Sequence, residues 1–296
     1  MTSAPESLAS YIPFQGKFLG PEGCRQFVVD EGSGVPVVMV HGNPTWCFYY
    51  RNLVAALKDR YRCIVPDHIG CGRSDAPNDE AYGYSLEDRV NDLERCLDEL
   101  VPDQAVHLVV HDWGGMIGMA WADRHPDQVL SFTILNTAGF RLPSDQPMPK
   151  AIAFARSGPG RWLIENLSGS ARFASVSAFA KPVSREIRRA YRAPYEDRGR
   201  RVATRRFVED IPLEASDPSY AIVHGVEQRL DRFTDRPAMI AWGMKDFVFT
   251  PKFLAAWKRH WPHAEVTTYD DCGHYVLEDA KDDLIPRIAA FLDDQV

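Results

Sequence analysis

Short apolar runs alternate with helical patterns over much of the chain. Each run holds five to seven residues, is rich in β-branched side chains and is nearly continuous, as in strands covered on both faces. The segments between the runs repeat apolar residues at helical spacing. This alternation is typical of parallel strands joined by crossover helices, so we predict an α/β fold. The predicted strands are 36–40, 61–65, 106–110, 129–135, 237–242 and 264–269, and the predicted helices are 49–57, 86–100, 113–124 and 279–292.

The pattern changes in the middle of the chain. Residues 141–149 are rich in proline and polar side chains, and the 65 residues that follow hold helical patterns without a convincing strand. Strand patterns then return. We therefore expect a core formed by residues 1–138 and 216–296, with a mostly parallel central sheet flanked by helices. A helical cap is expected to be inserted at residues 139–215.

Composition narrows the class of protein. The chain has 296 residues and a formal net charge of −7, which disfavours a general nucleic-acid binder because phosphate contacts need a basic surface. No run approaches 18 apolar residues, and the first ten residues lack the features of a signal peptide, so we expect no membrane insertion. The six cysteines are scattered without a CxxC pair. Reduced cysteines and a cytoplasmic location are therefore expected.

One segment of the expected cap is strongly basic. Residues 184–207 contain nine arginines and three acidic residues. An amphipathic helix would explain them, with the arginines in water and Ile187, Ala190, Tyr191 and Pro194 facing inward. Binding of an acidic partner is the alternative interpretation. A homo-oligomer also stays open.

An aspartate stands at the junction of a predicted strand and a predicted helix. Asp112 follows the strand at 106–110 and precedes the helix at 113–124, where a nucleophile elbow exposes its side chain. Val110 replaces the first glycine of the usual G-x-nucleophile-x-G pattern, and Gly114 keeps the second. Taken alone, Asp112 could instead cap the helix, since aspartate is a favoured N-cap.

A second loop follows the strand at 36–40. Residues 41–46 read His-Gly-Asn-Pro-Thr-Trp. In an α/β hydrolase, the loop at this place supplies an N–H group to the oxyanion hole. A plain turn would also explain the sequence, and His41 is interpreted as a core histidine. Asn43 is the candidate functional residue of this loop.

Two further candidates follow later strands. Asp246 comes after the strand at 237–242, and His274 comes after the strand at 264–269. Nucleophile, acid and histidine thus occur in the order of an α/β-hydrolase triad. Each residue alone could belong to an ordinary loop. Because all of these candidates lie at strand ends, we interpret them as one site.

Together these motifs resemble the haloalkane dehalogenase family of α/β hydrolases over about residues 25–140 and 216–290. The resemblance is greatest to its third subfamily, subfamily III, which is close to the β-lactone decarboxylases of bacterial olefin biosynthesis. The motifs that carry it are His41-Gly-Asn-Pro-Thr-Trp46, Pro66-Asp-His-Ile-Gly-Cys-Gly-Arg-Ser74, His111-Asp-Trp-Gly-Gly115, Gly243-Met-Lys-Asp246 and Gly273-His274.

The resemblance implies a role for each candidate. Asp112 would be the nucleophile and His274 the base, oriented by Asp246. The backbone N–H groups of Asn43 and Trp113 would form the oxyanion hole, and their side chains would bind halide. Trp113 could also simply fill core volume.

One branch of the family carries its acid at the position of residue 136. This sequence has Asn136 there. We therefore assign the acid to Asp246. Replacement of Asn136 by alanine is expected to be mild.

The chemistry suits these residue types. A carboxylate is ionised at neutral pH and can attack carbon directly, while N–H donors hold the departing halide. Water activated by the histidine would then hydrolyse the alkyl ester on Asp112. We expect an enzyme that converts halogenated aliphatics to alcohol and halide, without metal or organic cofactor. Its binding partners would be a small apolar substrate, halide and water.

Three alternatives stay open. A cis-β-lactone decarboxylase would use the same triad to release an alkene and CO₂. An epoxide hydrolase would need cap tyrosines, and Tyr191, Tyr195 and Tyr220 could be placed there only by guessing. A non-catalytic ligand receptor would be expected to have lost a triad residue, and none is lost. An apolar pocket lining is suggested by Phe140, Ile152, Phe154, Trp162, Leu163 and Phe173.

Overall fold

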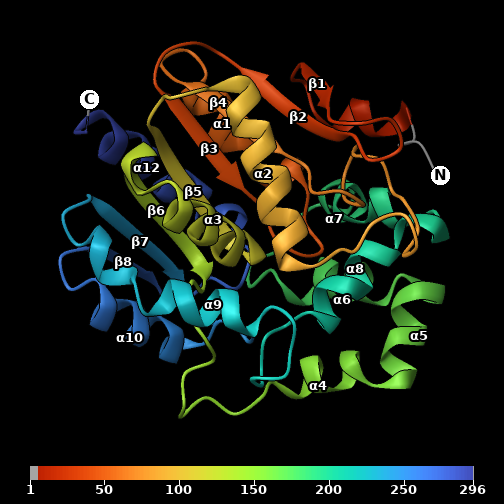
Figure 1. Ribbon diagram of the computed structural model, residues 1–296. Coiled ribbons are helices and arrows are strands. Elements are labelled where there is room, and N and C mark those ends of the chain that lie inside the picture. The colour runs from red at the N-terminus through yellow and green to blue at the C-terminus, as the bar shows by residue number, and fades with distance from the viewer. Residues whose placement is uncertain (1–5, 296) are drawn as a thin grey trace.

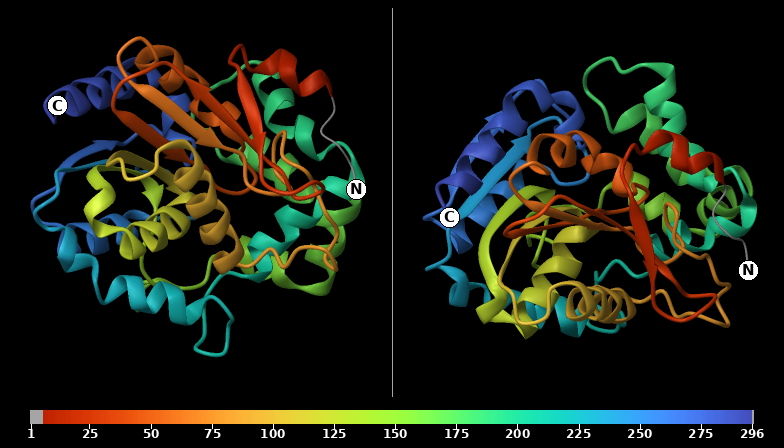
Figure 2. Two further views of the ribbon diagram at one scale, coloured as in Figure 1. Left: turned by 45° about the horizontal axis from the view of Figure 1, so that its top comes forward. Right: turned by 90° about the horizontal axis from the view of Figure 1, so that it is seen from above.

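A computed structural model describes residues 6–295 and contains one eight-stranded sheet (Figures 1 and 2). The strand order is β1-β2-β4-β3-β5-β6-β7-β8. β2 pairs antiparallel with both β1 and β4, and every other neighbouring pair, from β4–β3 to β7–β8, is parallel. This confirms the predicted α/β class. The strands are β1 Gly16–Leu19, β2 Gln26–Glu31, β3 Pro36–Val40, β4 Arg62–Pro66, β5 Val106–Asp112, β6 Val129–Thr137, β7 Ala238–Gly243 and β8 Glu265–Tyr269.

Helices cover both faces of the sheet. One face is packed by α2, α3, α9 and α10, whose apolar side chains join one buried cluster, and the other by α1, α11 and α12, which join a second. Strands covered on both faces must be apolar throughout, and β3 is buried at every position. The covering helices are α1 Arg51–Leu57, α2 Leu86–Leu100, α3 Trp113–Arg124, α9 Tyr220–Glu227, α10 Pro251–His260, α11 Val276–Asp279 and α12 Lys281–Asp293.

A group of helices between β6 and α9 stands apart from the layers that cover the sheet (Figure 1). We use the name cap for residues 139–215, which contain them. Successive cap helices pack on one another, α4 on α5 and α5 on α6. They are α4 Lys150–Arg156, α5 Gly158–Leu167, α6 Gly169–Ser177, α7 Arg185–Arg192 and α8 Val202–Glu209. Within residues 6–295 there are also six short 3₁₀ segments, at Glu6–Tyr11, Cys47–Tyr50, Pro126–Gln128, Ala193–Tyr195, Arg198–Arg200 and Leu230–Phe233.

Local sequence explains where the core helices begin. Ser85 and Asp88 form a reciprocal capping box at the start of α2, which ties down two otherwise unpaired backbone N–H groups. Helix α3 is buried at ten positions and packs against both β5 and β6.

No helix among residues 6–295 has the length and apolar character that a membrane crossing requires.

Candidate active site

Asp112 is held in a strained turn between β5 and α3. Its backbone has φ 52° and ψ −126°, a region that residues other than glycine rarely occupy. The carboxylate makes no capping hydrogen bond to α3, so the helix-cap interpretation fails. Gly114 permits this turn, because a Cβ there would lie 1.9 Å from the carbonyl oxygen of Val40. The geometry is that of a side chain exposed at the end of a strand.

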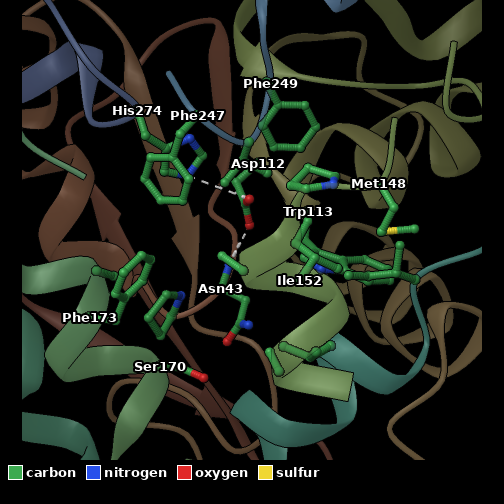
Figure 3. Close-up of a pocket in the computed structure, with 18 of the residues that line it drawn as sticks. Asn43, Asp112, Trp113, Met148, Ile152, Ser170, Phe173, Phe247, Phe249 and His274 are labelled. Carbon is green, nitrogen blue, oxygen red and sulfur yellow. Dashed lines mark hydrogen bonds and ion pairs between the residues drawn. The ribbon is translucent and has the colours of Figure 1, made fainter. Parts of the chain in front are cut away.

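The loop after β3 meets Asp112 directly (Figure 3). The backbone N–H of Asn43 donates a hydrogen bond of 2.6 Å to Oδ1 of Asp112. Gly42 makes this approach possible, since a Cβ at residue 42 would lie 2.1 Å from the same oxygen. The Asn43 side chain points toward the cap, where its Nδ2 is 3.4 Å from the Thr204 carbonyl oxygen of α8. Asn43 therefore contacts both the core and the cap.

His274 lies between two carboxylates. Its Nδ1 donates a 2.7 Å hydrogen bond to Oδ2 of Asp246, and its Nε2 is 3.5 Å from Oδ2 of Asp112. The Phe249 ring stacks parallel to the imidazole, with centroids 5.9 Å apart. The bond to Asp246 fixes the tautomer and leaves Nε2 facing Asp112. The structure thus brings together the three side chains that the sequence predicted as one site.

Burial and charge shift the titration of this group. Burial raises the pKa of Asp112 from 3.8, although the charge of His274 and hydrogen bonds from the Asn43 and Trp113 backbones oppose that shift. Burial alone would lower the pKa of His274, but the charges of Asp246 and Asp112 together raise it above 6.5.

Asn136 has a larger part in the site than its sequence position suggested. Its Nδ2 donates to Oδ2 of Asp246 at 3.0 Å and to the carbonyl oxygen of Gly243 at 3.1 Å. Its Oδ1 accepts a 2.8 Å bond from the Gly243 N–H. These contacts favour a larger effect of its loss than the mild one expected from the sequence, because Asn136 positions the carboxylate that contacts His274. Only the pairing of β6 with β7 reveals this role, and no local motif signals it.

Trp113 and Arg89 form an electropositive side of the site. The Trp113 indole lines the cavity described below, and no described residue accepts a hydrogen bond from its N–H. Its ring packs on Phe207, with centroids 5.2 Å apart. The guanidinium of Arg89 lies 3.7 Å from the Phe207 ring and 6.0 Å from that of Trp113. Arg89 is 1% exposed, so its charge acts in a poorly solvated setting.

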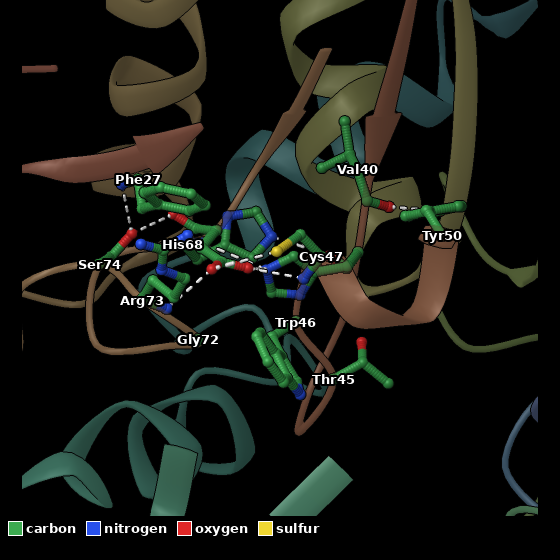
Figure 4. A network of polar contacts seen from close by, with 12 residues as sticks. Phe27, Val40, Thr45, Trp46, Cys47, Tyr50, His68, Gly72, Arg73 and Ser74 are labelled. Carbon is green, nitrogen blue, oxygen red and sulfur yellow. Dashed lines mark hydrogen bonds and ion pairs between the residues drawn. The ribbon is translucent and has the colours of Figure 1, made fainter. Parts of the chain in front are cut away.

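A buried network fixes the loop that carries Asn43 (Figure 4). Asp67 accepts hydrogen bonds from the backbone N–H groups of Cys47, at 2.6 Å, and Arg73, at 2.8 Å. Burial raises the pKa of Asp67 to about 6. His41 is fully buried and bonds to Gly42 and to the loop after β4, which confirms its interpretation as a core histidine.

A cavity of about 680 Å³ opens from the site into the cap. Asn43, Asp112, Trp113 and His274 lie at its core end, and the cap supplies mainly apolar side chains (Figure 3). Five of the six predicted apolar lining residues are present: Phe140, Ile152, Phe154, Leu163 and Phe173. Further apolar residues that the sequence did not single out include Met148, Val208, Ile211, Phe247 and Phe249.

Trp162 and the three tyrosines considered in the sequence analysis do not line the cavity. Trp162 is 56% exposed and lies outside the cavity lining, because it occupies the outer side of α5. The three tyrosines considered for an epoxide hydrolase are also outside it, and Tyr220 belongs to core helix α9 rather than to the cap. Tyr191 donates to Glu278, Tyr195 donates to the Thr45 carbonyl, and the Tyr220 hydroxyl accepts from Arg141. No tyrosine among the described residues lines the cavity.

Most arginines of the basic segment 184–207 make contacts within the fold. Arg200 is fully buried and donates to the carbonyls of Gly72 and Ser74, and Arg205 forms ion pairs with Asp79, Glu165 and Glu209. Other arginines of the segment that make hydrogen bonds or ion pairs are Arg188, Arg201 and Arg206. Some arginines of the segment therefore form hydrogen bonds or ion pairs within the fold, and others face solvent. Ala190, Tyr191 and Pro194 are buried as predicted.

Comparisons with known proteins agree with this geometry. A family model described as alpha/beta hydrolase fold matches residues 35–281. A cis-3-alkyl-4-alkyloxetan-2-one decarboxylase of Shewanella oneidensis is 47% identical, over 96% of this chain and 90% of that protein. Haloalkane dehalogenase 2 of Mycobacterium bovis is 29% identical, over 94% and 93%. The crystal structure of haloalkane dehalogenase DatA from Agrobacterium tumefaciens superposes with a TM-score of 0.85 at 23% identity, covering 99% and 100% of the two chains.

The match spans the sheet, the loops that carry the site and the cap. The predicted resemblance is confirmed in both of its parts, since dehalogenases and β-lactone decarboxylases are both relatives. The decarboxylase has the higher identity of the two. This chain is an enzyme of the α/β hydrolase family, in the group that contains these decarboxylases and haloalkane dehalogenases.

Proposed function

We propose that this protein is a β-lactone decarboxylase that converts a cis-3-alkyl-4-alkyloxetan-2-one into an alkene and CO₂. The observation that carries the proposal is the 47% identity with a protein of that name over nearly the whole chain. This reverses the order of the two activities expected from the sequence, where dehalogenation came first.

The shape of the cavity supports a long substrate. A bromoalkane of four heavy atoms would fill roughly 120 Å³, at about 30 Å³ for each water-sized group. The cavity holds about 680 Å³ and is mostly apolar, with its polar groups gathered at the core end. Two alkyl arms fixed to a polar four-membered ring match that distribution better than a short haloalkane does.

We assign the first step to Asp112. Its carboxylate attacks the ring carbon that bears the ring oxygen, so that the carbon–oxygen bond of the ring breaks and an ester to Asp112 forms. The leaving group is the substrate's own carboxylate. The side-chain N–H groups of Asn43 and Trp113, with the charge of Arg89 nearby, stabilise that anion.

The second step regenerates the enzyme without water. The carbon–carbon bond to the new carboxylate breaks and CO₂ departs. Its electron pair forms the carbon–carbon double bond, and the ester oxygen leaves as the carboxylate of Asp112. Atoms and charge balance with no proton transferred. We further propose that the cap, residues 139–215, selects the alkyl arms.

Haloalkane hydrolysis is the second candidate function. The free indole N–H of Trp113 and the amide of Asn43 beside Asp112 favour it, because both donors could hold a halide. Here His274 must activate water against the Asp112 ester. Epoxide hydrolysis is disfavoured, since no described tyrosine reaches the cavity to protonate an epoxide oxygen.

A comparison of two substrates tests the proposal. The purified enzyme would receive a long-chain cis-β-lactone or 1-bromodecane at equal concentration. Alkene and CO₂ should form at about 1 s⁻¹ or faster, within the usual range of enzymes. Bromide release should be at least about 100-fold slower. Bromide release without alkene formation from the lactone would overturn the proposal in favour of dehalogenation.

A further inference from the structure

The exposed apolar side chains of this protein are concentrated on three cap helices. Six large apolar residues are exposed among those that the structure describes, and five of them belong to α4, α5 and α6, within residues 150–177. They are Phe154, Trp162, Leu167, Phe173 and Val176, with exposures between 46% and 65%. We call these five residues the apolar cap face. Such a concentration marks an interaction surface, whereas single exposed apolar residues are ordinary.

This face adjoins the opening of the cavity, because two of its five residues, Phe154 and Phe173, also line the cavity. Lys150, Ala151, Phe154 and Phe173 line the cavity and are also exposed, so the cavity reaches solvent between α4 and α6. Phe173 packs edge-on against Phe247, which also lines the cavity. Whatever covers the apolar cap face therefore also covers the route by which an apolar ligand enters.

Charge is divided unequally between the cap and the core. Residues 139–215 hold 15 basic and 8 acidic residues, a net +7, whereas the rest of the chain holds 19 basic and 33 acidic residues, a net −14. Lys150, Arg161 and Arg172 are exposed on the same three helices as the apolar cap face. Aromatic and aliphatic side chains beside lysine and arginine are typical of surfaces that bind an anionic membrane interface.

A second copy of this chain fits the face less well. A symmetric dimer would bring two basic caps together, and their like charges would repel. It would also close both cavity openings. An anionic bilayer instead offers opposite charge and an apolar interior at the same contact.

We propose that the apolar cap face binds the surface of an anionic phospholipid bilayer and faces the cavity opening toward it. The side chains of Trp162, Leu167 and Val176 enter the interfacial layer, and Arg161 and Arg172 meet lipid phosphates. This deepens the proposed function, because a substrate with two long alkyl arms and a hydrocarbon product would both partition into the bilayer. It predicts peripheral, reversible binding.

Vesicle binding without substrate tests this independently of turnover. The full chain would be floated with vesicles of phosphatidylcholine alone or with about one third phosphatidylglycerol. Binding should be at least about tenfold stronger to the anionic vesicles and should weaken as salt is raised, because screening acts on exposed charges. A triple variant, Trp162→Ser with Leu167→Ser and Val176→Ser, should lose about tenfold or more. None of these three residues lines the cavity, so its turnover of a β-lactone in detergent should stay unchanged.

Matched variants separate the face from general charge. Arg161→Gln with Arg172→Gln should remove most of the preference for anionic vesicles. Arg185→Gln with Arg189→Gln, exposed cap arginines outside α4–α6, should have less effect, and Phe18→Ala, the exposed aromatic of β1, should have none.

Two results would overturn the inference. One is equal binding of the parent and the triple variant to anionic vesicles. The other is an oligomer, seen by light scattering, that the triple variant abolishes while vesicle binding is absent; the face would then be a contact between copies. If the parent enzyme binds anionic vesicles but does not turn over a β-lactone in detergent, that result would count against the proposed function alone.

Discussion

The strand ends of the core and the helices of the cap contribute different things to one cavity. The core end is polar, buried and closely tied, with Asp246 receiving hydrogen bonds from Asn136, Val248 and Phe249. The cap side is apolar, and its helices α4–α6 leave large side chains exposed. Reacting atoms need fixed geometry, whereas alkyl chains need only apolar volume. We therefore propose that the core determines the reaction and the cap determines which molecules undergo it.

The largest effect should come from Asp112, the core residue proposed to form the covalent bond. Asp112→Asn keeps the shape of the side chain but removes its negative charge. Turnover of both a β-lactone and a bromoalkane should fall by about 10⁴ or more. Alkene measured by gas chromatography and bromide measured by ion chromatography check this, and Asp145→Asn, an exposed cap carboxylate, is the control. Substantial alkene formation by the Asp112 variant would mean that the lactone reacts elsewhere or by another route.

His274→Gln should split the two reactions. With 1-bromodecane the variant should stop after alkylation, because no base remains to activate water. Intact-protein mass should then show one decyl group, mapping to Asp112. With the β-lactone, alkene formation should fall by no more than about tenfold, since neither step needs water. An equal loss of 10³-fold or more in both reactions would contradict a water-free route.

Asn136→Ala should impair haloalkane turnover by about 10–100-fold. The substitution removes the side chain that holds Asp246 at 3.0 Å and bridges to Gly243, so the carboxylate that orients His274 gains freedom. Asp246→Asn in the same assay should cost about 10²–10⁴. Bromide release is the measurement. An unchanged rate in Asn136→Ala would show that the backbone N–H groups alone suffice to hold Asp246.

A cap substitution should change selectivity and leave the chemistry intact. Ala155→Trp places a large ring in the cavity lining. The value of kcat/KM for a β-lactone with long arms should fall about 10–100-fold, whereas that for a short-armed lactone should change by less than about threefold. Ala153→Trp, exposed on the same helix and outside the lining, is the matched control. Equal losses for both chain lengths would show that the cap also shapes the reacting groups.

The smallest expected effect lies where core and cap meet. Arg89→Met removes a buried charge whose Nη1 donates to the Tyr84 carbonyl but whose Nε and Nη2 have no hydrogen-bond partner among the described residues, so stability toward urea should fall only slightly. Decarboxylation should nevertheless slow by about 3–10-fold, because a positive charge behind Trp113 is lost. Arg200→Met, which removes bonds to the carbonyls of Gly72 and Ser74, should destabilise the fold instead. Unchanged turnover in Arg89→Met would exclude an electrostatic role.

The features that the sequence could predict are those determined by local residue patterns. The continuous apolar run of β3 and the periodic patterns of α2 and α3 were predicted to the residue, because each is determined by its own side chains. Asp112, Asp246 and His274 were recognisable because each lies at the end of a strand or in the loop after one. Strands β1 and β2 were missed for different reasons. β1 is an edge strand with exposed positions, and β2 begins with Gln26 and ends with Asp30 and Glu31, so neither has a continuous apolar run.

Other features depend on tertiary contacts that no local pattern encodes. Asn136 acquires its role only when β6 and β7 become neighbours. Trp162 and Phe173 belong to similar helical patterns, yet Phe173 faces the cavity opening and Trp162 faces outward. The sequence pattern does not distinguish the arginines of residues 184–207 from one another, although some are buried and form contacts within the fold and others are exposed to solvent. In each case the packing partner decides the outcome.

The fate of a single substrate tests the central claim most directly. The wild-type enzyme would be given one long-chain cis-β-lactone, and both possible products would be measured by gas chromatography with mass spectrometry. If Asp112 opens the ring and the resulting carboxylate departs as CO₂, alkene and CO₂ should form in equal amounts with almost no β-hydroxy acid. If His274 instead delivers water, β-hydroxy acid should dominate, and that result would contradict the proposed decarboxylation.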